Sequence, residues 1–287
     1  MGKQFTFINA RVIDPRVEIE SSETLTINDG LIEKRDGGIK GKVIDCGGMC
    51  LAPGIVDIGV KVCEPGEKHK ESFRSASNAA ATGGVTSLVT RPDTKPAIDN
   101  PELLEFFKNR GKEFSKVRVF PTASLTKKNN GKKITEIGFL HDGGAVAFTD
   151  GFNSIPNTKT FHQILKYASD FDTLIIGHPQ DHFLTKNTSA SSGVFASIKG
   201  LSSSPNMAEK IGIERDTALI NNLNIRYHAD QVTTKIGLDV LKQAKKSNSR
   251  ITAGTSIHHL LFNELDIGNY RTFFKLKPPL RSNIDRE

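Results

Sequence analysis

The feature that most constrains this chain is an alternation of strand-like and helix-like segments that starts after Pro53-Gly54. Short apolar runs typical of buried strands cover residues 55–60, 85–90, 117–121, 145–149, 174–177, 225–228 and 251–253. Helix-like stretches lie between them at 71–81, 101–108, 159–169 and 235–245. Strands that alternate with helices in this way form parallel sheets. The chain is therefore predicted to be an α/β protein.

Seven strands with helical connections favour a (β/α)8 barrel of the TIM type that lacks one strand. Residues 283–287 look like the start of another helix, so we expect the barrel to be incomplete in this chain and the sequence to be part of a longer protein. The alternative is a doubly wound parallel sheet that is complete at seven strands. Its dinucleotide-binding form is disfavoured, because no Gly-x-Gly-x-x-Gly motif follows the first run.

The first 54 residues have a different pattern. They contain short strand-like runs without intervening helices, and Asn28-Asp29-Gly30 between two such runs is a strong hairpin-turn signal. We predict a small N-terminal β-sandwich domain over residues 1–54, built from antiparallel strands, followed by the barrel over 55–287.

Composition excludes several classes of protein. The net charge is +7, from 39 Lys and Arg against 32 Asp and Glu, but the basic residues are scattered and not interleaved with aromatic residues, so we expect no nucleic-acid partner. No apolar stretch approaches the roughly 18 residues that span a bilayer, and the N-terminus lacks the apolar segment of a signal peptide, so no membrane association is expected. Three cysteines, an odd number, favour a reducing, cytoplasmic location over a disulfide framework.

In a barrel of this type, residues at the carboxyl ends of the strands line the active site. Most of the residues at these positions are polar, and several are ionisable. The positions are Gly59, Lys61, Cys63, Arg91, Asp93, Asp150, His178, His228, Gln231, Thr255 and Ser256.

Sequence motifs along most of the chain resemble the amidohydrolase superfamily, and in particular the dihydroorotases. The matching segments are Leu51 to Gly66, Ala79 to Thr86, Arg91 to Pro96, Ala147 to Asp150, His258 to Phe262 and Pro278 to Arg281, in the family's order. Hydantoinases and allantoinases of the same superfamily fit the Glu-Pro-Gly and Pro-Pro-Leu-Arg segments less well.

The resemblance implies a zinc-dependent hydrolase of cyclic amides, yet several of the family's site residues are replaced. Two His ligands on the first strand correspond here to Gly59 and Lys61. Glycine offers no ligand atom, and a protonated lysine repels a cation. The Arg that holds the substrate carboxylate corresponds to Cys63, and a substrate-binding Asn corresponds to Asp93, whose charge is expected to repel an anionic substrate.

Further along the chain the resemblance retains one metal ligand and loses another. His178 occupies the position of a ligand on the fifth strand, whereas Gln231 replaces the ligand His of the sixth. Lys277 replaces a substrate-binding Asn, and Asp150 matches a region whose Asp bridges metals in some family members. The family's catalytic Asp would lie beyond Glu287.

These replacements predict that the strand ends bind no metal, because a catalytic zinc needs three or more protein ligands. We therefore expect no cofactor and no catalytic residue, and interpret His178 as a pocket histidine hydrogen-bonded to its neighbours. The three cysteines lack the spacing of a tetrahedral metal site. The His258-His259 pair is expected to contribute a helix cap and a core contact.

The leading hypothesis is a catalytically inactive dihydroorotase-like protein of pyrimidine biosynthesis. It resembles the non-catalytic chains that some bacteria pair, as structural subunits, with aspartate carbamoyltransferase, so we expect that enzyme as a partner, self-association, or both. One alternative is an active dihydroorotase that interconverts dihydroorotate and N-carbamoyl-aspartate. Another is an anion-binding sensor that uses Lys61, Lys95 and Lys277.

Overall fold

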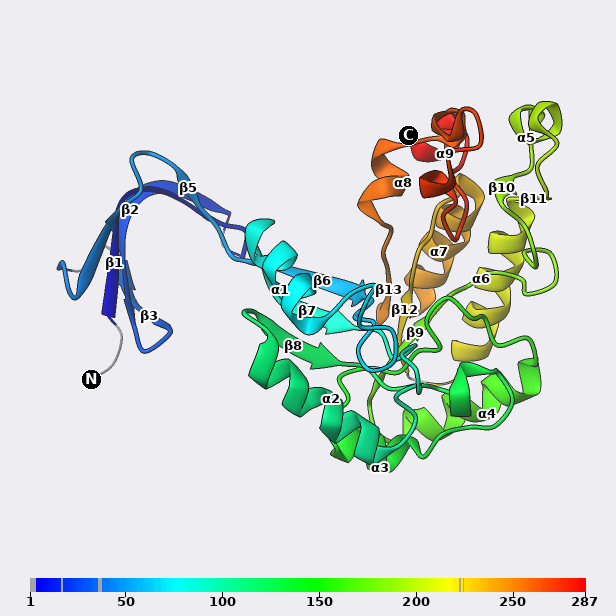
Figure 1. Ribbon diagram of the computed structural model, residues 1–287, viewed down its shortest axis with the longest axis horizontal. Coiled ribbons are helices and arrows are strands. Elements are labelled where there is room, and N and C mark those ends of the chain that lie inside the picture. The colour runs from blue at the N-terminus through cyan, green and yellow to red at the C-terminus, as the bar shows by residue number, and fades with distance from the viewer. Residues whose placement is uncertain (1–3, 17, 36–37, 222, 224) are drawn as a thin grey trace. The chain divides into compact units, whose positions relative to one another are not determined.

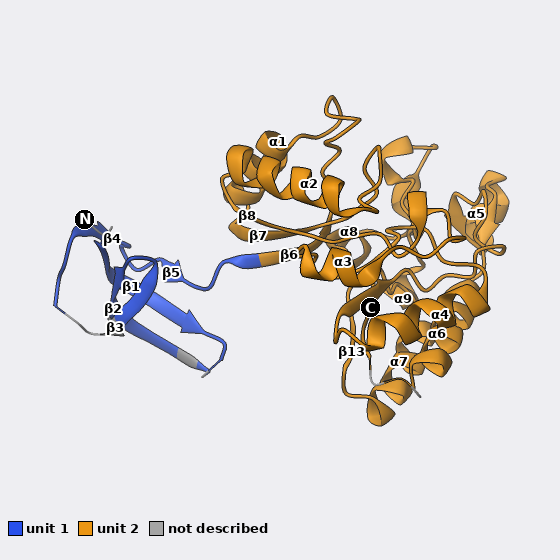
Figure 2. Cartoon of the chain, turned by 90° about the horizontal axis from the view of Figure 1, so that it is seen from below, with its two compact units in different colours: residues 1–55 blue, residues 56–287 orange. Residues whose placement is uncertain are grey.

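The computed structural model describes residues 4–16, 18–35, 38–221, 223 and 225–287. By their internal contacts the residues form two compact units, 1–55 and 56–287, which Figure 2 shows in different colours.

The N-terminal unit is one five-stranded sheet. Its strands are β1 (Gln4–Asp14), β2 (Ile19–Asn28), β3 (Leu31–Arg35), β4 (Lys42–Asp45) and β5 (Cys50–Leu51), in the order β3-β2-β1-β4 with β5 also paired to β1. The predicted hairpin between β2 and β3 is confirmed: Asp29 and Gly30 both have positive φ, 50° and 79°, as a tight hairpin turn with a right-handed twist requires.

Two predictions for this unit are wrong. The β1, β2 and β3 strands are antiparallel as expected, but β4 and β5 pair with β1 in parallel, because the chain crosses over after β3. The buried Thr6 hydroxyl fixes this crossover, since its Oγ1 donates to the Lys40 carbonyl at 2.7 Å and accepts from the Lys40 N–H at 2.9 Å. Within the described residues there is one sheet with a small core, rather than the two packed sheets of a sandwich.

Apart from Ile55, the last residue of the first unit, all seven predicted strand positions lie in the second unit. The strands are β6 (Ile55–Val60), β7 (Val85–Thr90), β8 (Arg118–Pro121), β9 (Leu174–Gly177), β12 (Arg226–Ala229) and β13 (Ile251–Ala253), with a short extended run around Phe148 between β8 and β9. That run joins two three-stranded groups, because Phe148 forms parallel bridges to Ala123 and to Ile175.

The strand order within this sheet follows the order of the chain, from β6 to β13, without reversal. A doubly wound sheet has a point at which the order reverses. The alternative of a doubly wound sheet is therefore wrong, and the sheet is singly wound. Among the described residues β6 and β13 are not paired with each other, so the sheet has two edges (Figure 1).

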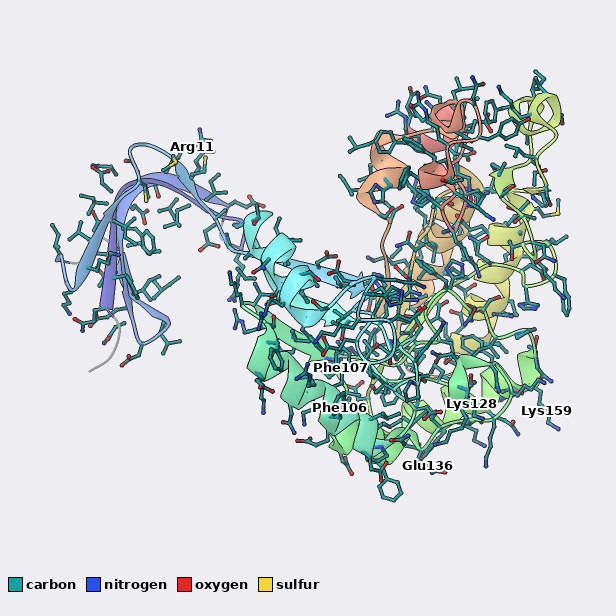
Figure 3. All side chains as sticks on the ribbon, viewed as in Figure 1. Arg11, Phe106, Phe107, Lys128, Glu136 and Lys159 are labelled. Carbon is teal, nitrogen blue, oxygen red and sulfur yellow. The ribbon has the colours of Figure 1, made fainter. Side chains whose placement is uncertain are left out.

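The four predicted helices are confirmed with slightly different ends, as α1 (Phe73–Thr82), α2 (Pro101–Phe114), α4 (Thr158–Ser169) and α7 (Lys235–Ser247). The Asn100 cap of α2 is also confirmed, since its side chain accepts the Leu103 N–H at 2.9 Å with Pro101 at the first helical position. Gly84, with φ of 76°, makes the turn from α1 into β7. On α2, Phe107 is fully buried against Phe73 of α1, whereas the adjacent Phe106 is exposed (Figure 3).

The sequence patterns did not predict α6 (Met207–Ile220), which lies between β11 and β12 in the chain. The remaining short elements are α3 (Ile137–Asp142), α5 (Val194–Lys199), α8 (Ile257–Leu261), α9 (Asn283–Arg286), β10 (Ala190–Ser191), β11 (Ser203–Ser204) and three 3-10 turns at Lys127–Asn129, Glu264–Ile267 and Thr272–Phe274. In the described part of the chain no helix is long and apolar enough to cross a membrane.

Candidate functional site

The carboxyl ends of β6 and β7 hold a cluster of charged side chains. Asp93 lies at its centre: Oδ2 of Asp93 accepts from Lys61 Nζ at 2.9 Å and from Arg91 Nη2 at 3.0 Å. Arg91 is 4% exposed, and its guanidinium carbon lies 3.5 Å from the centre of the Phe152 ring. The two cations compensate the charge of the Asp93 carboxylate. Asp93 is therefore not the free negative charge that we expected to repel an anionic substrate.

Arg91 also lies beside Gly59, where the resemblance predicts the first metal-binding imidazole. A Cβ atom added to Gly59 would lie 4.0 Å from Cδ of Arg91 and 4.0 Å from Oδ2 of Asp230. Both distances are ordinary van der Waals contacts, so the Cβ itself would fit with these two side chains as its nearest neighbours. Gly59 has φ of 88°, a conformation that L-residues rarely adopt. The backbone conformation at this position therefore disfavours a histidine.

The carboxyl group of Asp230 lies near the same guanidinium. Burial raises the pKa of Asp230, while the charge of Arg91 and hydrogen bonds from Gln231 act in the opposite direction. Gln231 has φ of 59° at the sharp bend that follows β12. The Arg91 guanidinium thus lies at the strand ends with the carboxyl groups of Asp93 and Asp230 near it.

His178 follows β9 and is buried, with 5% of its surface exposed. Its ring lies edge-on to Phe152, with the ring centres 5.7 Å apart. Among the described residues neither ring nitrogen has a hydrogen-bond partner, so the prediction that neighbours satisfy this histidine is wrong. Burial, followed by the positive charges of Lys277, Arg91 and Arg281, lowers the pKa of His178 to about 3, and the imidazole is therefore neutral at pH 7.

Asp150 does not face this cluster as a free carboxylate. Its Oδ1 accepts the Thr126 N–H at 2.9 Å and its Oδ2 accepts the Thr126 hydroxyl. Burial raises the pKa of Asp150 to about 6 against these hydrogen bonds. Asp150 therefore holds the loop that contains Thr126.

The remaining predicted residues each have a different environment. Cys63 is buried and free, and His228 hydrogen-bonds Thr252 at 2.8 Å. Lys277 is solvent-exposed at the edge of the cluster. Lys95, one of the three lysines of the sensor interpretation, pairs with Glu67 at 3.1 Å, as Lys61 pairs with Asp93.

The residues at these strand ends do not fit a zinc ion. In the parts of the chain that the structure describes, no three His, Cys, Asp or Glu side chains are grouped so that they could share a metal. The side chains that lie there instead include Arg91 and Lys61, and a catalytic zinc needs three strong donors rather than neighbouring cations.

One buried group that the sequence patterns missed connects two of the loops at the strand ends. Glu209 of α6 is fully buried, and its carboxylate accepts the backbone N–H groups of Thr233 and Thr234 at 2.8–3.1 Å and both of their hydroxyls. It also accepts from Gln180 Nε2 at 2.9 Å and faces Nη2 of the buried Arg281 at 3.5 Å. Glu209 thus ties the loops after β9 and β12 to the Pro-Pro-Leu-Arg segment. We call these five residues the Glu209 network.

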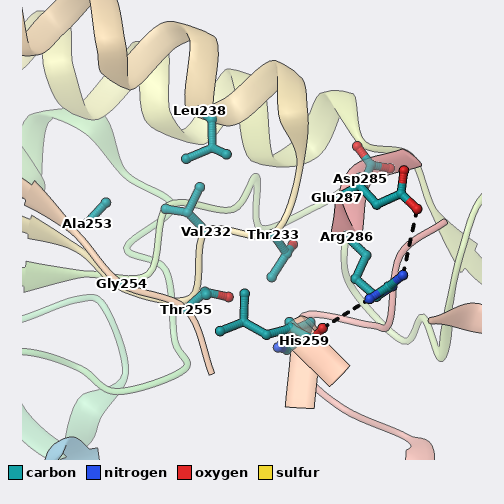
Figure 4. Close-up of a pocket in the computed structure, with 11 residues that line it drawn as sticks. Val232, Thr233, Leu238, Ala253, Gly254, Thr255, His259, Asp285, Arg286 and Glu287 are labelled. Atoms are coloured by element: carbon teal, nitrogen blue, oxygen red, sulfur yellow. Dashed lines mark hydrogen bonds and ion pairs between the residues drawn. The ribbon is translucent and has the colours of Figure 1, made fainter. Parts of the chain in front are cut away.

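Figure 4 shows a cavity of about 310 Å³ beside β13 and α7. It is lined in part by Val232, Thr233 and His259 and by the last residues, Asp285 to Glu287. His259 is buried there between the Ser256 hydroxyl and the Pro278 carbonyl, which bears out its expected core contact. The cavity contains none of the residues that the resemblance assigns to the site.

The chain is an α/β protein, with a singly wound parallel sheet preceded in the chain by a small β unit, and its fold matches that of hydantoinases and dihydroorotases. The L-hydantoinase of Arthrobacter aurescens matches it with a TM-score of 0.85 at 20% identity, over 100% of this chain and 65% of that one. The dihydroorotase of Saccharomyces cerevisiae matches with a TM-score of 0.62 at 15% identity, over 80% of this chain and 63% of that one. At such identities the likeness shows the fold alone.

Within this class the chain belongs to the dihydroorotase-like family. The family model described as Dihydro-orotase-like matches residues 48–236. A dihydroorotase of Bacillus pumilus is 37% identical over 274 residues, and a dihydroorotase-like protein of Pseudomonas putida is 33% identical over 286 residues. These matches cover 96% and 98% of this chain but 62% and 68% of the two relatives, so the chain spans about two thirds of their length.

Proposed function

We propose that this chain is a non-catalytic dihydroorotase-like protein whose second unit contains seven of the eight strands of a (β/α)8 barrel. The observation that carries the proposal is the cluster at the strand ends, where Lys61 and Arg91 hold Asp93 and Gly59 offers no ligand atom. A guanidinium supplies positive charge but has no site at which water can bind and ionise, as it does on zinc. The strand ends therefore carry the positive charge of Arg91, which cannot activate water as a bound metal ion does.

The substrate-binding positions support the same proposal. Cys63 replaces the Arg that holds the substrate carboxylate in dihydroorotases, and Asp93 is held by Lys61 and Arg91 instead of facing the pocket as a neutral amide. Groups that position a substrate act together, and misplacing one of them lowers the rate strongly.

The experiment measures zinc content and dihydroorotate turnover on the same purified chain, after incubation with zinc and removal of excess. We expect substoichiometric zinc and no turnover in either direction. The variant Gly59→His/Lys61→His is expected to remain inactive, because Arg91 still pairs with Asp93 at the strand ends and Cys63 is unchanged. Stoichiometric zinc together with zinc-dependent turnover in the unaltered chain would contradict the proposal and favour an active dihydroorotase.

We further propose that the chain acts in the cytoplasm in pyrimidine biosynthesis, as a structural partner of aspartate carbamoyltransferase. Its support is the family relationship, together with Cys46, Cys50 and Cys63, which are all free, as expected in a reducing compartment. An interface of about 1,600 Å² in total suffices for a specific complex. Co-purification in near-equal amounts and loss of transferase assembly without this chain are the expected results. A transferase that assembles equally well without it would refute this partnership.

A further inference from the structure

A second cavity lies between the loop after β6, the first turn of α1 and the last turns of α2. Its volume is about 160 Å³, roughly that of five molecules in liquid water. The residues that line it are Glu64, Lys68, Ser72, Arg74, Arg110 and Phe114. In the described part of the chain its lining includes neither the charged cluster around Asp93 nor any residue that the resemblance assigns to the active site. It is therefore a separate place on the fold.

The lining of this cavity is cationic. Three of its side chains carry a positive charge and one carries a negative charge, which gives a net charge of +2. The negative charge belongs to Glu64, which is 6% exposed. Its Oε1 accepts from Nε of Arg110 at 3.1 Å and from Nη2 of the same guanidinium, and its Oε2 accepts the Phe73 N–H at 3.4 Å. Glu64 therefore orients Arg110, and the charges of these two residues compensate each other.

The other two cations have no carboxylate partner. Lys68 and Arg74 are both solvent-exposed, and among the described residues the side chain of neither forms an ion pair or a hydrogen bond. Two uncompensated positive charges around one cavity repel each other. An anion that binds both of them removes this repulsion.

Phe114 restrains the two guanidinium groups of the lining. The guanidinium carbon of Arg110 lies 3.9 Å from the centre of the Phe114 ring, and that of Arg74 lies 6.0 Å from it. Such contacts between a cation and an aromatic ring are attractive. Nη1 of Arg110 faces the exposed carboxylate of Glu113 at 3.8 Å, which is longer than a hydrogen bond. This nitrogen therefore retains N–H groups for a ligand.

The arrangement of these donors favours a phosphoryl group over a carboxylate. A guanidinium is a planar fork of N–H groups that matches two oxygens of a phosphate, and an ammonium binds phosphate as a point charge. A phosphoryl group has three terminal oxygens and can accept from several surrounding cations at once, whereas a carboxylate has two oxygens in one plane. Its charge of up to −2 also equals the excess positive charge of the lining.

We propose that this cavity binds a dianionic phosphoryl group, either as inorganic phosphate or as the phosphate end of a monoester. The phosphoryl oxygens accept from Lys68, Arg74 and Nη1 of Arg110, and Phe114 offers an apolar face to a substituent on the phosphate. This binding requires no metal, no turnover and no residue at the strand ends, so it goes beyond the proposed function.

The test is isothermal titration calorimetry of the full chain at pH 8 and low ionic strength, in buffer that contains EDTA. The ligands are inorganic phosphate, methyl phosphate and dimethyl phosphate. The first two carry about two negative charges at this pH, and dimethyl phosphate carries one. We expect saturable one-to-one binding of the dianions. Dimethyl phosphate should bind about tenfold or more weaker, because it lacks one charge and one charged acceptor oxygen.

The two dianions distinguish the possible sources of the phosphoryl group. Tighter binding of methyl phosphate supports a monoester as the ligand, in which the substituent contacts Phe114. Equal or weaker binding of methyl phosphate supports inorganic phosphate, with recognition of the phosphoryl group alone.

Variants then locate the site. Arg74→Met and Lys68→Met should each weaken binding of the dianions about tenfold or more. Lys112→Met is the matched control, because Lys112 is an exposed cation of α2 outside the lining, and this variant should bind as the unaltered chain does. The proposal is overturned if neither dianion shows saturable heat at tens of millimolar, if dimethyl phosphate binds as tightly as the dianions, or if Arg74→Met and Lys68→Met bind like Lys112→Met. Because EDTA is present throughout and no turnover is measured, none of these outcomes depends on whether the chain binds zinc or is an active enzyme.

Discussion

Replacing Glu209 by Gln tests whether the Glu209 network holds the strand-end loops. The change leaves the size of the side chain almost unaltered but removes its charge and turns one acceptor oxygen into an NH₂ donor. Both carboxylate oxygens accept backbone or hydroxyl hydrogens from Thr233 and Thr234, so the new donor must face another donor. Arg281, which is 3% exposed, would at the same time lose the carboxylate at 3.5 Å.

The magnitude follows from these two losses. Removing one partner of a buried ion pair costs about 3–5 kcal/mol, because the remaining charge is left uncompensated. For a unit of this size 1 kcal/mol corresponds to about 2–4 °C, so the melting temperature should fall by roughly 10 °C. The matched control is Glu214→Gln on the same helix, whose carboxylate is half-exposed and lies 3.7 Å from Lys210. A surface pair of this kind contributes less than about 1 kcal/mol.

The assay is thermal and urea unfolding of both variants beside the unaltered chain. A double variant, Glu209→Gln/Arg281→Met, removes both charges and should be more stable than Glu209→Gln alone. If Glu209→Gln is no less stable than Glu214→Gln, the network does not carry the stability that its geometry implies. A double variant that is less stable than Glu209→Gln would instead show that Arg281 acts through other contacts.

Three further predictions concern single residues. Gly177→Ala should lower the free energy of unfolding by about 1–3 kcal/mol in urea titrations, because the new Cβ would lie 2.1 Å from Oη of the buried Tyr227; a loss well below about 1 kcal/mol would contradict this. The pKa of His178, about 3 in the fold because of burial, is below its ordinary value of 6.5, so stability is complete above pH 6.5 and is lost as the pH falls toward 3. The free energy of unfolding should therefore fall by about 3 kcal/mol between pH 7 and pH 4, and His178→Asn should abolish this fall. An equal fall in that variant would refute the prediction. Asn100→Ala should destabilise the chain by about 1 kcal/mol in thermal melts, since the Leu103 N–H loses its cap, whereas an unchanged melt would show the cap to be dispensable.

The sequence predicted the strands of the second unit well because each is a short apolar run between turn residues. The cap at Asn100 and the hairpin turn at Asp29-Gly30 were predictable because each depends on residues close together in the chain. The parallel pairing of β4 and β5 with β1 was not, because it depends on a crossover fixed by the Thr6 hydroxyl.

The candidate site shows a similar division. Loss of the ligand at Gly59 is visible in the sequence, but nothing in the sequence places the side chain of Arg91 beside Gly59. α6 was missed because its buried residues include Glu209 and Asp216 and lie on several sides of the helix, which hides the apolar period. One signal was present: Gly212 interrupts this segment, and a glycine inside a helix often marks a close approach, here to the backbone of Pro179.

Arg91 changes what the folded chain requires from its surroundings. A metal ion at the strand ends would have to be supplied after synthesis, could exchange with competing ions, and could be removed by chelators. A guanidinium joined to the backbone is present in every copy as soon as the chain is made, and its number per chain cannot vary. Folding and any assembly that depends on the charge balance around Asp93 and Asp230 should therefore proceed to the same extent in zinc-starved and zinc-replete cells.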